Sequence, residues 1–498
     1  MEGGTRLANE VKGLNEECGV FGVWGDNQAA QRTYFGLHSL QHRGQEGAGI
    51  VVRNDDGKLV GHKGMGLLAD VFDRQETIDE LIGTAAIGHV RYGTAGSHGI
   101  ENIQPLNFHY TDYDVSLAHN GNLTNAVSLR RQLEENGAIF QSNSDTEVLM
   151  HLIQRQPQAK FEDRLSASLR QIEGGFAYLI LTDHALYAAL DPNGFRPLVI
   201  GHLENGSWIV ASETCALDVV GAKFVRDVQP GELITIDDEG YRVSKYTENT
   251  QLTICSMEYI YFARPDSDIY GVNVHLARQR MGRQVARENN IDADIVVGVP
   301  NSSLSAASGV ALELGIPDEM GLMKNQYSTR TFIQPTQALR EQGVKMKLSA
   351  IRAVVEGKKV ALVDDSIVRG TTSTYIVKML RDAGAKSVHL LIASPPLKYP
   401  CFYGIDIEHT RELMAANYTV EEMREQIGAD SLSFLSLEGL IKSIGLNQDA
   451  PNEGLCVSYF DGEYPTPLYD YEATFENPKT ANDHVLTATL NQEVNTNA

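Results

Sequence analysis

Hydrophobic and polar positions follow two different patterns in the two halves of the chain. In the first half, short runs of β-branched and aromatic residues alternate with glycine and asparagine turns, which is typical of strands. Examples are Phe176 to Leu181, Leu186 to Leu190 and Trp208 to Ala211. Apolar residues recur at helical spacing in Leu129 to Glu135 and in Thr146 to Gln154, so amphipathic helices interrupt the strands. The pattern predicts α+β layers.

From about residue 275 the pattern changes to apolar strand, glycine-containing turn, amphipathic helix and strand again. DIVVGVP (Asp294 to Pro300) is followed by the helical pattern Leu304 to Leu314. A second such unit consists of KKVALVDD (Lys358 to Asp365), the helical pattern Ser373 to Ala383, and SVHLLIAS (Ser387 to Ser394). Alternating strands and helices of this kind are typical of an α/β domain, a parallel sheet with crossover helices.

The change of pattern predicts two domains with a boundary near Lys245 to Leu252. We expect an N-terminal domain over residues 18–248 and a second domain over residues 249–473. The segment 474–498 is rich in Asn, Thr and Glu with few apolar residues, so we expect a poorly ordered tail.

Composition narrows the class of protein. A chain of 498 residues is long enough for two to four domains. A net charge of −23 argues against a nucleic-acid binder, because such proteins need clustered Lys and Arg. Apolar runs fall short of the roughly 20 residues that span a bilayer, and the leader Met1 to Glu17 lacks the apolar stretch of a signal peptide. We therefore expect a cytoplasmic enzyme that does not bind membranes.

Cys18 follows the polar leader and opens the run CGVFGVWG, which has the pattern of a buried strand. If residues 1–17 were a propeptide, its removal would place a free α-amine, which titrates near a pH of about 8, on the residue that carries the thiol. One residue would then supply nucleophile and base. Judged by its flanks alone, Cys18 is better explained as a free cysteine of the core than as a nucleophile.

Three glycine-rich segments and one acidic segment strengthen the catalytic interpretation. Attack on a glutamine side-chain amide creates an oxyanion, and Asn120-Gly121 offers a side-chain amide and an unhindered backbone N–H to stabilise it. Arg91 suits the α-carboxylate of glutamine by bidentate pairing, and Asp145 suits the α-ammonium. The alternative for Asn-Gly is a tight turn with no further role. The segments are HRGQEGAG (His42 to Gly49), HVRYGT (His89 to Thr94), HNGNLTN (His119 to Asn125) and SNSDTE (Ser142 to Glu147).

Together these segments resemble the class II glutamine amidotransferases, a family with an N-terminal nucleophile. The resemblance implies stacked antiparallel sheets between helices, with Cys18 as nucleophile, and Asn120 and Gly121 as the oxyanion hole. It further implies that Arg43, Arg91 and Asp145 bind glutamine.

In the second half, VALVDDSIVRGTTS (Val360 to Ser373) has an apolar strand that ends in two carboxylates, and a Gly-Thr-Thr-Ser turn that opens a helix. Backbone N–H groups and hydroxyls at a helix N-terminus form an anion site, and Gly370 lets the chain approach a phosphate closely. Asp364 and Asp365, about 6 Å apart, repel each other by on the order of 2 to 3 kcal/mol at an effective dielectric constant of about 20. They favour a cation such as Mg²⁺ or the hydroxyls of a ribose. A solvated turn or helix cap is the alternative for Asp-Asp alone.

Two more segments fit a phosphate site. GVPNSS (Gly298 to Ser303) ends the other strand and offers further N–H donors and hydroxyls, including Ser302 and Ser303. The stretch Lys324 to Lys347 is basic on an acidic protein and lacks a packed-strand pattern, so it is a candidate for a mobile lid. A solvated surface segment is the alternative.

These features resemble the type I phosphoribosyltransferases, and both halves together, from about Cys18 to Tyr471, resemble the amidophosphoribosyltransferase family of purine biosynthesis. The resemblance implies that Asp364 and Asp365 contact ribose and Mg²⁺, one ion per subunit, with Ser302 as a further metal contact and Ser303 beside it. It also implies a lid that includes Lys324, purine nucleotides as feedback inhibitors, and a homo-oligomer, by resemblance a tetramer. The 5-phosphate would be held by Arg369, Gly370, Thr371, Thr372 and Ser373.

One feature departs from the family pattern. Many members carry a [4Fe–4S] cluster on four cysteines, and Cys255, Cys401 and Cys456 stand where three of them belong, whereas Tyr459 replaces the fourth. Because a cubane cluster normally takes four thiolates, we expect no cluster. The cysteines are then interpreted as small buried hydrophobes.

The sequence therefore predicts an enzyme that makes 5-phosphoribosylamine, glutamate and pyrophosphate from glutamine, water and 5-phosphoribosyl 1-pyrophosphate, with the ammonia passing internally. The aromatic run Tyr259 to Pro265 near the boundary is a candidate lining for that path. One alternative is a regulator that senses phosphoribosyl pyrophosphate and has a vestigial glutaminase. Another is a hexosamine-forming amidotransferase, whose sugar-isomerase half would not need VALVDDSIVRGTTS.

Overall fold

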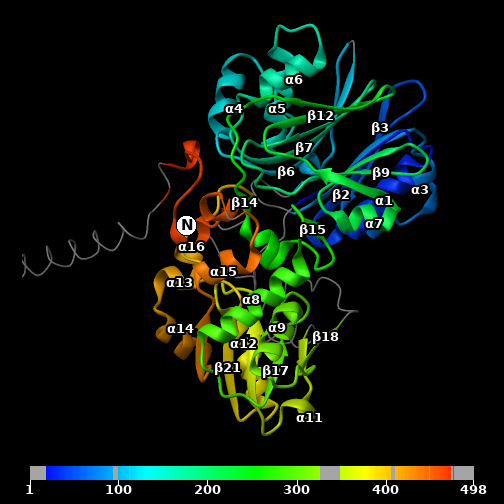
Figure 1. Cartoon of the computed structure of the whole chain (residues 1–498). Coiled ribbons are helices and arrows are strands. Elements are labelled where there is room, and N and C mark those ends of the chain that lie inside the picture. The colour runs from blue at the N-terminus through cyan, green and yellow to red at the C-terminus, as the bar shows by residue number, and fades with distance from the viewer. Residues whose placement is uncertain are drawn as a thin grey trace, which may run out of the picture.

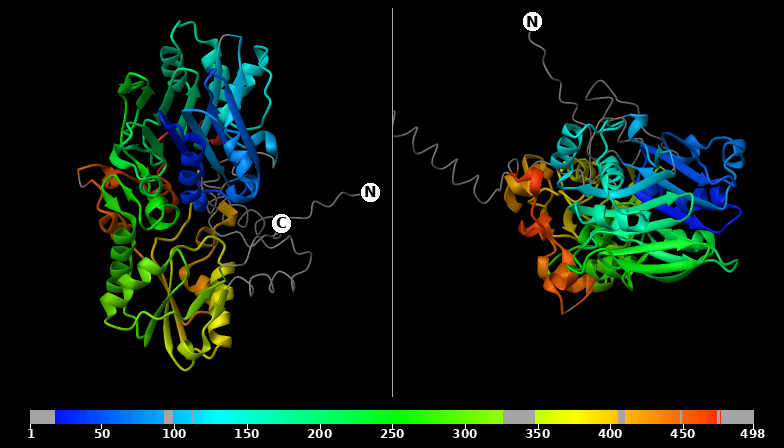
Figure 2. Two further views of the ribbon diagram at one scale, coloured as in Figure 1. Left: turned by 90° about the vertical axis from the view of Figure 1, so that its right-hand side faces the viewer. Right: turned by 90° about the horizontal axis from the view of Figure 1, so that it is seen from above.

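A computed structural model describes residues 18–92, 99–111, 113–325, 348–404, 410–447, 449–472 and 475. The predicted leader (1–17), most of the predicted lid and all of the predicted tail (474–498) except residue 475 lie outside the described residues. The described chain forms two stacked halves, the N-terminal half at the top of Figure 1 and the C-terminal half below it, as the views of Figure 2 also show.

The N-terminal half contains two antiparallel sheets packed face to face. The first sheet has the order β11-β9-β10-β1-β4-β2-β3 and the second β13-β12-β8-β7-β6-β5. The strands of the first are β1 (Gly19–Trp24), β2 (Gly47–Arg53), β3 (Leu59–Met65), β4 (Ala85–Arg91), β9 (Val199–His202), β10 (Trp208–Ala211) and β11 (Lys223–Asp227). The strands of the second are β5 (Leu106–His109), β6 (Asp114–Leu123), β7 (Gly174–Thr182), β8 (Leu186–Leu190), β12 (Glu232–Asp237) and β13 (Gly240–Lys245).

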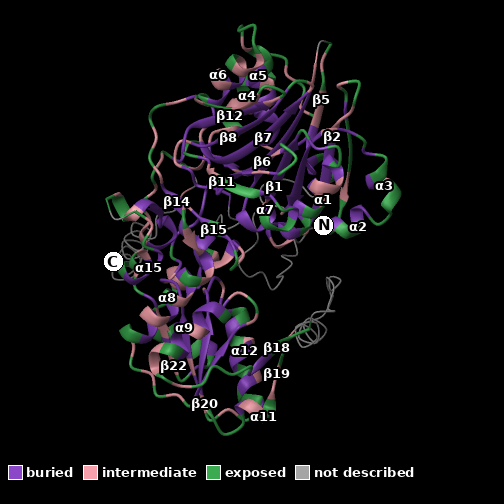
Figure 3. Ribbon diagram, turned by 45° about the vertical axis from the view of Figure 1, so that its right-hand side comes forward, coloured by how far each residue is buried: buried purple, intermediate pink, exposed green. Residues whose placement is uncertain are grey.

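Helices cover the outer face of each sheet, and the central strands between them are buried along most of their length (Figure 3), whereas the outer strands β3, β11 and β13 are largely exposed or half-buried. The first sheet is covered by α1 (Ala29–Ser39), α2 (Leu68–Val71), α3 (Gln75–Asp79) and α7 (Thr214–Val220). The second is covered by α4 (Ala126–Glu135), α5 (Thr146–Arg155) and α6 (Phe161–Leu169). Small residues let the sheets approach: a Cβ at Gly22 would lie 3.2 Å from Leu179 Cδ1.

The C-terminal half contains a parallel sheet with the order β17-β20-β21-β22. Its strands are β17 (Ile295–Gly298), β20 (Lys359–Asp364), β21 (Ser387–Ile392) and β22 (Ser431–Phe434). One face packs against α8 (Val274–Glu288), α9 (Leu304–Leu314) and α15 (Leu437–Ile444). The other packs against α12 (Thr371–Asp382) and α14 (Val420–Ile427). The predicted combination of stacked antiparallel sheets and a parallel-sheet domain is confirmed.

Short elements complete this half and join it to the first. β18 (Leu322–Lys324) pairs with β19 (Leu348–Ala350), and β15 (Asp268–Ile269) pairs with β16 (Val272–Asn273). At the boundary, β14 (Ile254–Cys255) pairs in parallel with β23 (Leu455–Cys456), so the end of the chain returns beside the link between the halves (Figure 1). Other short helices of this half are α11 (Arg352–Val355), α13 (Met414–Asn417), α16 (Ser458–Asp461), the 3-10 turns η4 (Thr410–Glu412), η5 (Pro451–Gly454) and η6 (Tyr469–Tyr471), and a π-helical turn, η3 (Glu258–Phe262), among the described residues.

The strand and helix predictions agree with the structure within a few residues. The predicted strand Phe176 to Leu181 lies in β7, and the predicted helix Leu304 to Leu314 is α9. β13 ends at Lys245 and β14 begins at Ile254. The predicted domain limits are compatible with these bounds and stay a prediction.

Close packing of α8 on α9 generates the first testable prediction. A Cβ at Gly282 would lie 1.9 Å from the carbonyl oxygen of Ala306. We expect Gly282→Ala to lower the free energy of unfolding by about 1 to 3 kcal/mol through overpacking, although alanine is the better helix former by about 1 kcal/mol. Denaturant unfolding measures this change. Arg283→Ala on the same helix serves as the control, and equal stability of the two variants contradicts the prediction.

Candidate functional site

Cys18 lies directly before β1, the strand between β10 and β4 in the first sheet. β1 pairs with β4 so that Gly19 stands opposite Val90, which brings Cys18 beside Arg91. The Cys18 thiol is partly buried and donates to the carbonyl oxygen of Tyr92 at 3.7 Å. Its own carbonyl oxygen accepts a hydrogen bond from Arg43 Nε at 3.2 Å. The fold therefore holds the thiol at a strand end within reach of other polar groups.

Asn120 lies on β6 of the second sheet. Its neighbour in the chain, His119, contacts β4 of the first sheet. His89 Nε2 on β4 is 3.0 Å from the carbonyl oxygen of His119, which ties the two strands together. Asn120 is 1% exposed, and its Nδ2 has no acceptor among the described residues. An unpaired buried amide donor is costly and calls for a partner supplied from outside.

Gly121 has a backbone geometry that requires glycine. Its φ is +142°, and a Cβ there would lie 2.0 Å from the carbonyl oxygen of Gly175. The N–H groups two residues to either side, of His119 and Leu123, point away from β7, to Gln104 Oε1 and Asp145 Oδ2. Because N–H directions alternate along a strand, the N–H of Gly121 points to the same side of β6 as those of His119 and Leu123.

Arg91 is the last residue of β4, and Asp145 contacts Leu123, the last residue of β6. The Arg91 guanidinium is buried, and its Nη1 donates to Glu46 Oε2 at 2.6 Å. Asp145 precedes α5, and its Oδ2 accepts from the N–H of Leu123 at 2.9 Å. Burial raises the pKa of Asp145, but nearby His119 and two backbone N–H groups outweigh this, so the pKa is below its ordinary value. The carboxylate is ionised at neutral pH, as a partner for an ammonium group must be.

Arg43 lies in a buried cluster of charged side chains beside Cys18. Its side chain is fully buried, and Nη1 and Nη2 donate to Glu213 Oε1 at 2.5 Å and Glu258 Oε1 at 2.6 Å. Glu213 also accepts from His42 Nε2 at 2.7 Å and Ser267 Oγ at 2.6 Å. Burial raises the pKa of Glu213, but His42 and Arg43 more than reverse this and hold that pKa far below its usual range.

The Arg43 geometry favours a positioning role over direct contact with glutamine. Glu213 precedes α7 in the N-terminal half, and Glu258 is the first residue of η3 in the C-terminal half. Arg43 Nε donates a hydrogen bond to the carbonyl oxygen of Cys18. Arg43 therefore links the candidate nucleophile to a carboxylate of each half. Glutamine binding by Arg43 stays a prediction without support from these contacts.

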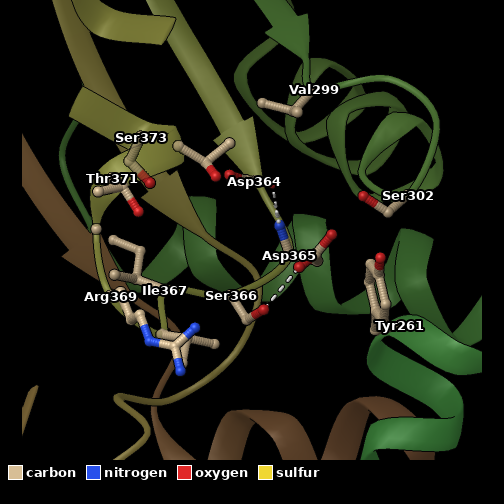
Figure 4. A pocket seen from close by; sticks show the side chains of 13 residues that line it. Tyr261, Val299, Ser302, Asp364, Asp365, Ser366, Ile367, Arg369, Thr371 and Ser373 are labelled. Carbon is tan, nitrogen blue, oxygen red and sulfur yellow. Dashed lines mark hydrogen bonds between the residues drawn. The ribbon is translucent and has the colours of Figure 1, made fainter. Parts of the chain in front are cut away.

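The second site is a pocket at the carboxyl end of the parallel sheet (Figure 4). In Figure 4, Asp364, Asp365 and Ser366 lie between Ser302 and Tyr261 on one side and Thr371 and Ser373 on the other. Open α/β sheets bind their ligands in the crevice at the carboxyl ends of the parallel strands. The lining residues are Tyr261, Val299, Ser302, Asp364 to Arg369, Gly370, Thr371, Thr372 and Ser373.

The two adjacent aspartates carry the electrostatics of this pocket. Both are 7% exposed. Burial and the neighbouring Asp365 raise the pKa of Asp364 well above its ordinary value, and burial raises that of Asp365 as well. Ser303 Oγ donates to Asp364 Oδ1 at 3.0 Å, and Ser366 Oγ to Asp365 Oδ1 at 2.7 Å. Negative charge confined here favours a bound cation.

The turn that opens α12 is built to receive an anion. Gly370 caps the helix with a φ of +75°, and a Cβ there would lie 2.4 Å from Met414 Sδ. No side chain among the described residues caps the first N–H groups of α12, so they are available to a phosphate. Arg369 lines the pocket and forms an ion pair with Glu412.

Magnesium fits these donors. Among the described residues, no group of three or more His, Cys, Asp or Glu side chains is arranged to hold a metal ion by itself. Two carboxylates with serine hydroxyls beside an anion turn suit Mg²⁺, because that ion usually keeps waters and shares substrate phosphate oxygens.

An iron–sulfur cluster does not fit the cysteines. Tyr459 Oη lies 3.0 Å from Cys255 Sγ and accepts from Cys401 Sγ at 3.4 Å. The tyrosine is 1% exposed, so its ring fills the space between thiols that a cluster would need. Cys456 Sγ lies 3.3 Å from Ser458 Oγ.

The structure brings most predicted residues of the second site together but not all of them. One pocket is lined by Ser302, Asp364, Asp365 and the turn Arg369 to Ser373. Ser303 is outside this lining, and its hydroxyl donates a hydrogen bond to Asp364 Oδ1. Lys324 ends β18, is exposed, and is absent from the lining. Residues 326–347 of the predicted lid lie outside the described residues.

Two contributors to the second site went unrecognised in the sequence. Tyr261 of η3 lines the pocket. Arg278 of α8 donates from Nε to the carbonyl of Tyr259 at 2.7 Å and, by its charge, lowers the pKa of Asp365. The aromatic run around Tyr261 was noticeable, but the direction of a single side chain is set by η3 and has no sequence signal.

Comparison with known proteins assigns both halves. A glutamine amidotransferase domain model matches residues 95–219, and a phosphoribosyl transferase domain model matches residues 274–394. With the two sites described above, the chain is a glutamine-dependent phosphoribosyl-transfer enzyme. No helix within the described residues is long and apolar enough to span a membrane.

Full-length relatives narrow the assignment. Amidophosphoribosyltransferase of Staphylococcus aureus (strain MRSA252) is 59% identical over 465 residues, 93% of this chain and 94% of the relative. Amidophosphoribosyltransferase of Bacillus subtilis (strain 168) is 58% identical over 92% of this chain and 96% of the relative. A solved glutamine phosphoribosylpyrophosphate amidotransferase from B. subtilis, complexed with ADP and GMP, is 56% identical with a TM-score of 0.86, covering 91% of this chain and 98% of that one.

A second solved structure, described as the allosteric regulatory enzyme of purine biosynthesis, is 57% identical with a TM-score of 0.87, covering 91% of this chain and 97% of that one. The chain belongs to the amidophosphoribosyltransferase family. It converts glutamine, water and 5-phosphoribosyl 1-pyrophosphate to 5-phosphoribosylamine, glutamate and pyrophosphate in purine biosynthesis, as the sequence predicted.

The buried aspartate pair makes a prediction about stability and pH. A carboxyl whose pKa is raised on folding stabilises the folded protein only while it is protonated, fully below its unfolded pKa of about 4. That contribution is lost as pH rises through the raised folded pKa of Asp364. We expect Asp364→Asn to stabilise the ligand-free protein at pH 7 by about 1 kcal/mol or more, and to abolish use of phosphoribosyl pyrophosphate.

Thermal unfolding between pH 4 and 8 without Mg²⁺ measures the effect. The gain of Asp364→Asn over the wild type should grow as pH rises across that range. Asp292→Asn, which removes an exposed carboxylate paired with Lys359, is the matched control. A variant at Asp364 less stable than the wild type at pH 7 contradicts the electrostatic argument.

Proposed function

We propose that Cys18 is the nucleophile that releases ammonia from glutamine, and that Asn120 and Gly121 stabilise the oxyanion. The observation that carries this proposal is the buried Asn120 Nδ2 without an acceptor among the described residues, on the strand tied to β4 near Cys18. A tetrahedral oxyanion would satisfy that donor and the N–H of Gly121 at once. Arg91 would receive the α-carboxylate of glutamine and Asp145 its α-ammonium.

The chemistry of this half proceeds through a thioester. The Cys18 sulfur attacks the amide carbon, and the proton from the thiol passes through the α-amine of Cys18 to the leaving nitrogen. Collapse of the oxyanion breaks the C–N bond and frees ammonia. Water then hydrolyses the glutamyl thioester, giving glutamate and restoring the thiol. This route requires the α-amine of Cys18 to be free, so removal of residues 1–17 is part of the proposal.

In the second half, ammonia attacks C1 of phosphoribosyl pyrophosphate, the C1–O bond to pyrophosphate breaks, and the new amine loses a proton. We place the 5-phosphate on the turn Arg369 to Ser373 and the ribose beside Asp364 and Asp365. When bound, Mg²⁺ at Asp364, Asp365 and Ser302 would neutralise the leaving pyrophosphate. Tyr259, Ile260 and Phe262 of η3 are buried between the two sites, and an apolar path past them would keep ammonia unprotonated.

Three further properties complete the proposal. Tyr459 between the thiols supports a chain without an iron–sulfur cluster. The relative solved with ADP and GMP supports purine nucleotides as feedback inhibitors of this chain. A homo-oligomer, a tetramer by family resemblance, stays a prediction, as do the limits of the two domains.

Replacement of the nucleophile tests the division of labour. We expect Cys18→Ala to abolish formation of phosphoribosylamine from glutamine, while formation from added ammonium at high pH stays within about twofold of the wild type, because the second site is untouched. Glutamate and pyrophosphate release, measured together, should be equal in the wild type. Cys215→Ala, which removes a buried thiol of the same half, is the control.

The intact mass of the active wild type supplies an independent check, since it should correspond to a chain that starts at Cys18. Full activity in a chain that still begins at Met1 contradicts the role of the α-amine. Glutamate release in clear excess of pyrophosphate contradicts internal transfer of ammonia.

Removal of the oxyanion donor makes a quantitative prediction. We expect Asn120→Ala to lower kcat for glutamine hydrolysis by about 10²- to 10³-fold, the loss typical of one oxyanion-hole donor. The Michaelis constant for glutamine should change far less, because the oxyanion exists only beyond the ground state. Steady-state glutaminase assays measure both constants. A large rise in KM at unchanged kcat would assign Asn120 to substrate binding instead.

A further inference from the structure

Tyr459 holds one short segment of chain at two points. Its hydroxyl meets Cys255 Sγ at 3.0 Å and Cys401 Sγ at 3.4 Å. Its backbone carbonyl accepts from the N–H groups of Lys398 at 2.8 Å and Tyr399 at 3.1 Å. One fully buried residue therefore fixes the chain on both sides of Pro400.

The segment that follows, Cys401 to Gly404, crosses to the N-terminal half. The N–H of Tyr403 donates to Cys401 Sγ at 3.3 Å, which sets the turn of this loop. The carbonyl of Phe402 accepts from Asn122 Nδ2 at 2.9 Å. The Tyr403 ring stacks on Phe195 with centroids 4.1 Å apart, and its carbonyl accepts from Arg196 Nη2. The loop is thus held by the thiol cluster at one end and by the N-terminal half at the other.

Gly404 touches the backbone of the proposed oxyanion hole. A Cβ at Gly404 would lie 3.2 Å from Gly121 Cα, and the φ of Gly404 is +127°. On its other side, Gly121 pairs with Phe176 of β7. The pairing of β6 with β5 ends at Leu117, opposite Leu106, before the strand reaches the proposed oxyanion donors. The loop lies over this stretch of β6 and over the start of β7, where a Cβ at Gly175 would lie 2.9 Å from the carbonyl oxygen of Tyr403.

We propose that Tyr459 is a positioning residue for the glutaminase reaction: together with the thiols of Cys255 and Cys401 it fixes the loop Cys401 to Gly404 as the wall that aligns Gly121 and Asn120. The tyrosine hydroxyl does this by hydrogen bonds, in the place where a metal cluster does not fit. The proposal rests on the proposed function, because it needs Asn120 and Gly121 to be the oxyanion donors.

Tyr459→Phe tests this inference, since it removes only the hydroxyl that joins the two thiols. We expect kcat for glutamine-dependent phosphoribosylamine formation to fall roughly fivefold, the effect of one lost hydrogen bond on a transition state. KM for glutamine should change less than twofold, and the ammonium-dependent reaction should keep its wild-type rate. Tyr246→Phe, which removes another buried hydroxyl bonded to the carbonyl of Leu190, is the control and should leave both activities unchanged.

Two outcomes overturn the inference. An unchanged glutamine-dependent kcat shows that the loop does not need the hydroxyl, and an equal loss of both activities shows that Tyr459 only supports the fold. If Tyr459→Phe does not fold, Cys401→Ala and Cys401→Ser are measured by the same two assays. The serine variant, which keeps a hydrogen-bonding group, should then retain more glutamine-dependent activity than the alanine variant, and equal activities of the two contradict the inference.

Failure of the proposed function gives a different result. In that case Cys18→Ala or Asn120→Ala would leave glutamine use intact. If both of those variants behave as predicted and Tyr459→Phe does not, only the positioning role of Tyr459 is wrong.

Discussion

The buried guanidinium of Arg43 is the interaction on which the relation between the two halves depends. A charge removed from water is stable only with good partners, and Glu213 and Glu258 supply them from opposite sides of the domain boundary. Loss of either carboxylate would remove one of the two negative charges that compensate this buried cation. Arg43 also donates to the carbonyl oxygen of Cys18, the proposed nucleophile. One ionic cluster therefore fixes Cys18, α7 and η3 relative to one another.

Around that cluster, both sites carry groups that the protein alone leaves poorly satisfied. In the N-terminal half, the amide of Asn120 is the unsatisfied group. In the C-terminal half, the poorly satisfied groups are the carboxylates of Asp364 and Asp365, whose pKa values are raised by burial. Rigid strands make this possible, since β6 and β20 have cores on both sides that resist relaxation. Such local costs are typical of sites that a substrate completes.

Much of this arrangement could be predicted from the sequence, because it depends on neighbours in the chain. The strand, the paired aspartates and the glycine turn of Val360 to Ser373 are consecutive, and local rules place them in one pocket. Asn120 and Gly121 are consecutive as well, so their neighbourhood could be predicted, while their role as oxyanion donors stays a proposal. Fold class followed from the change of hydrophobic period near residue 275.

The contacts that could not be predicted join residues far apart in the chain. Arg43 meets a carboxylate 215 positions away, and nothing in HRGQEGAG distinguishes that partner from a substrate. The phenol of Tyr459 likewise meets the thiol of Cys255 across 204 positions. For Lys324 the local sequence was misleading. Its basic segment predicted contact with a ligand, but in the described structure Lys324 lies exposed at the end of β18.

The loop Cys401 to Gly404 has a consequence for how this protein is divided. It belongs to the C-terminal half but packs on the last residues of β6 and on the start of β7. A glutaminase fragment that stops at the boundary would lack this loop and would expose the part of the sheet that the loop covers. The N-terminal half is therefore a unit of sequence and of chemistry without being a self-sufficient module, and a transplant into another enzyme must bring a replacement for that loop.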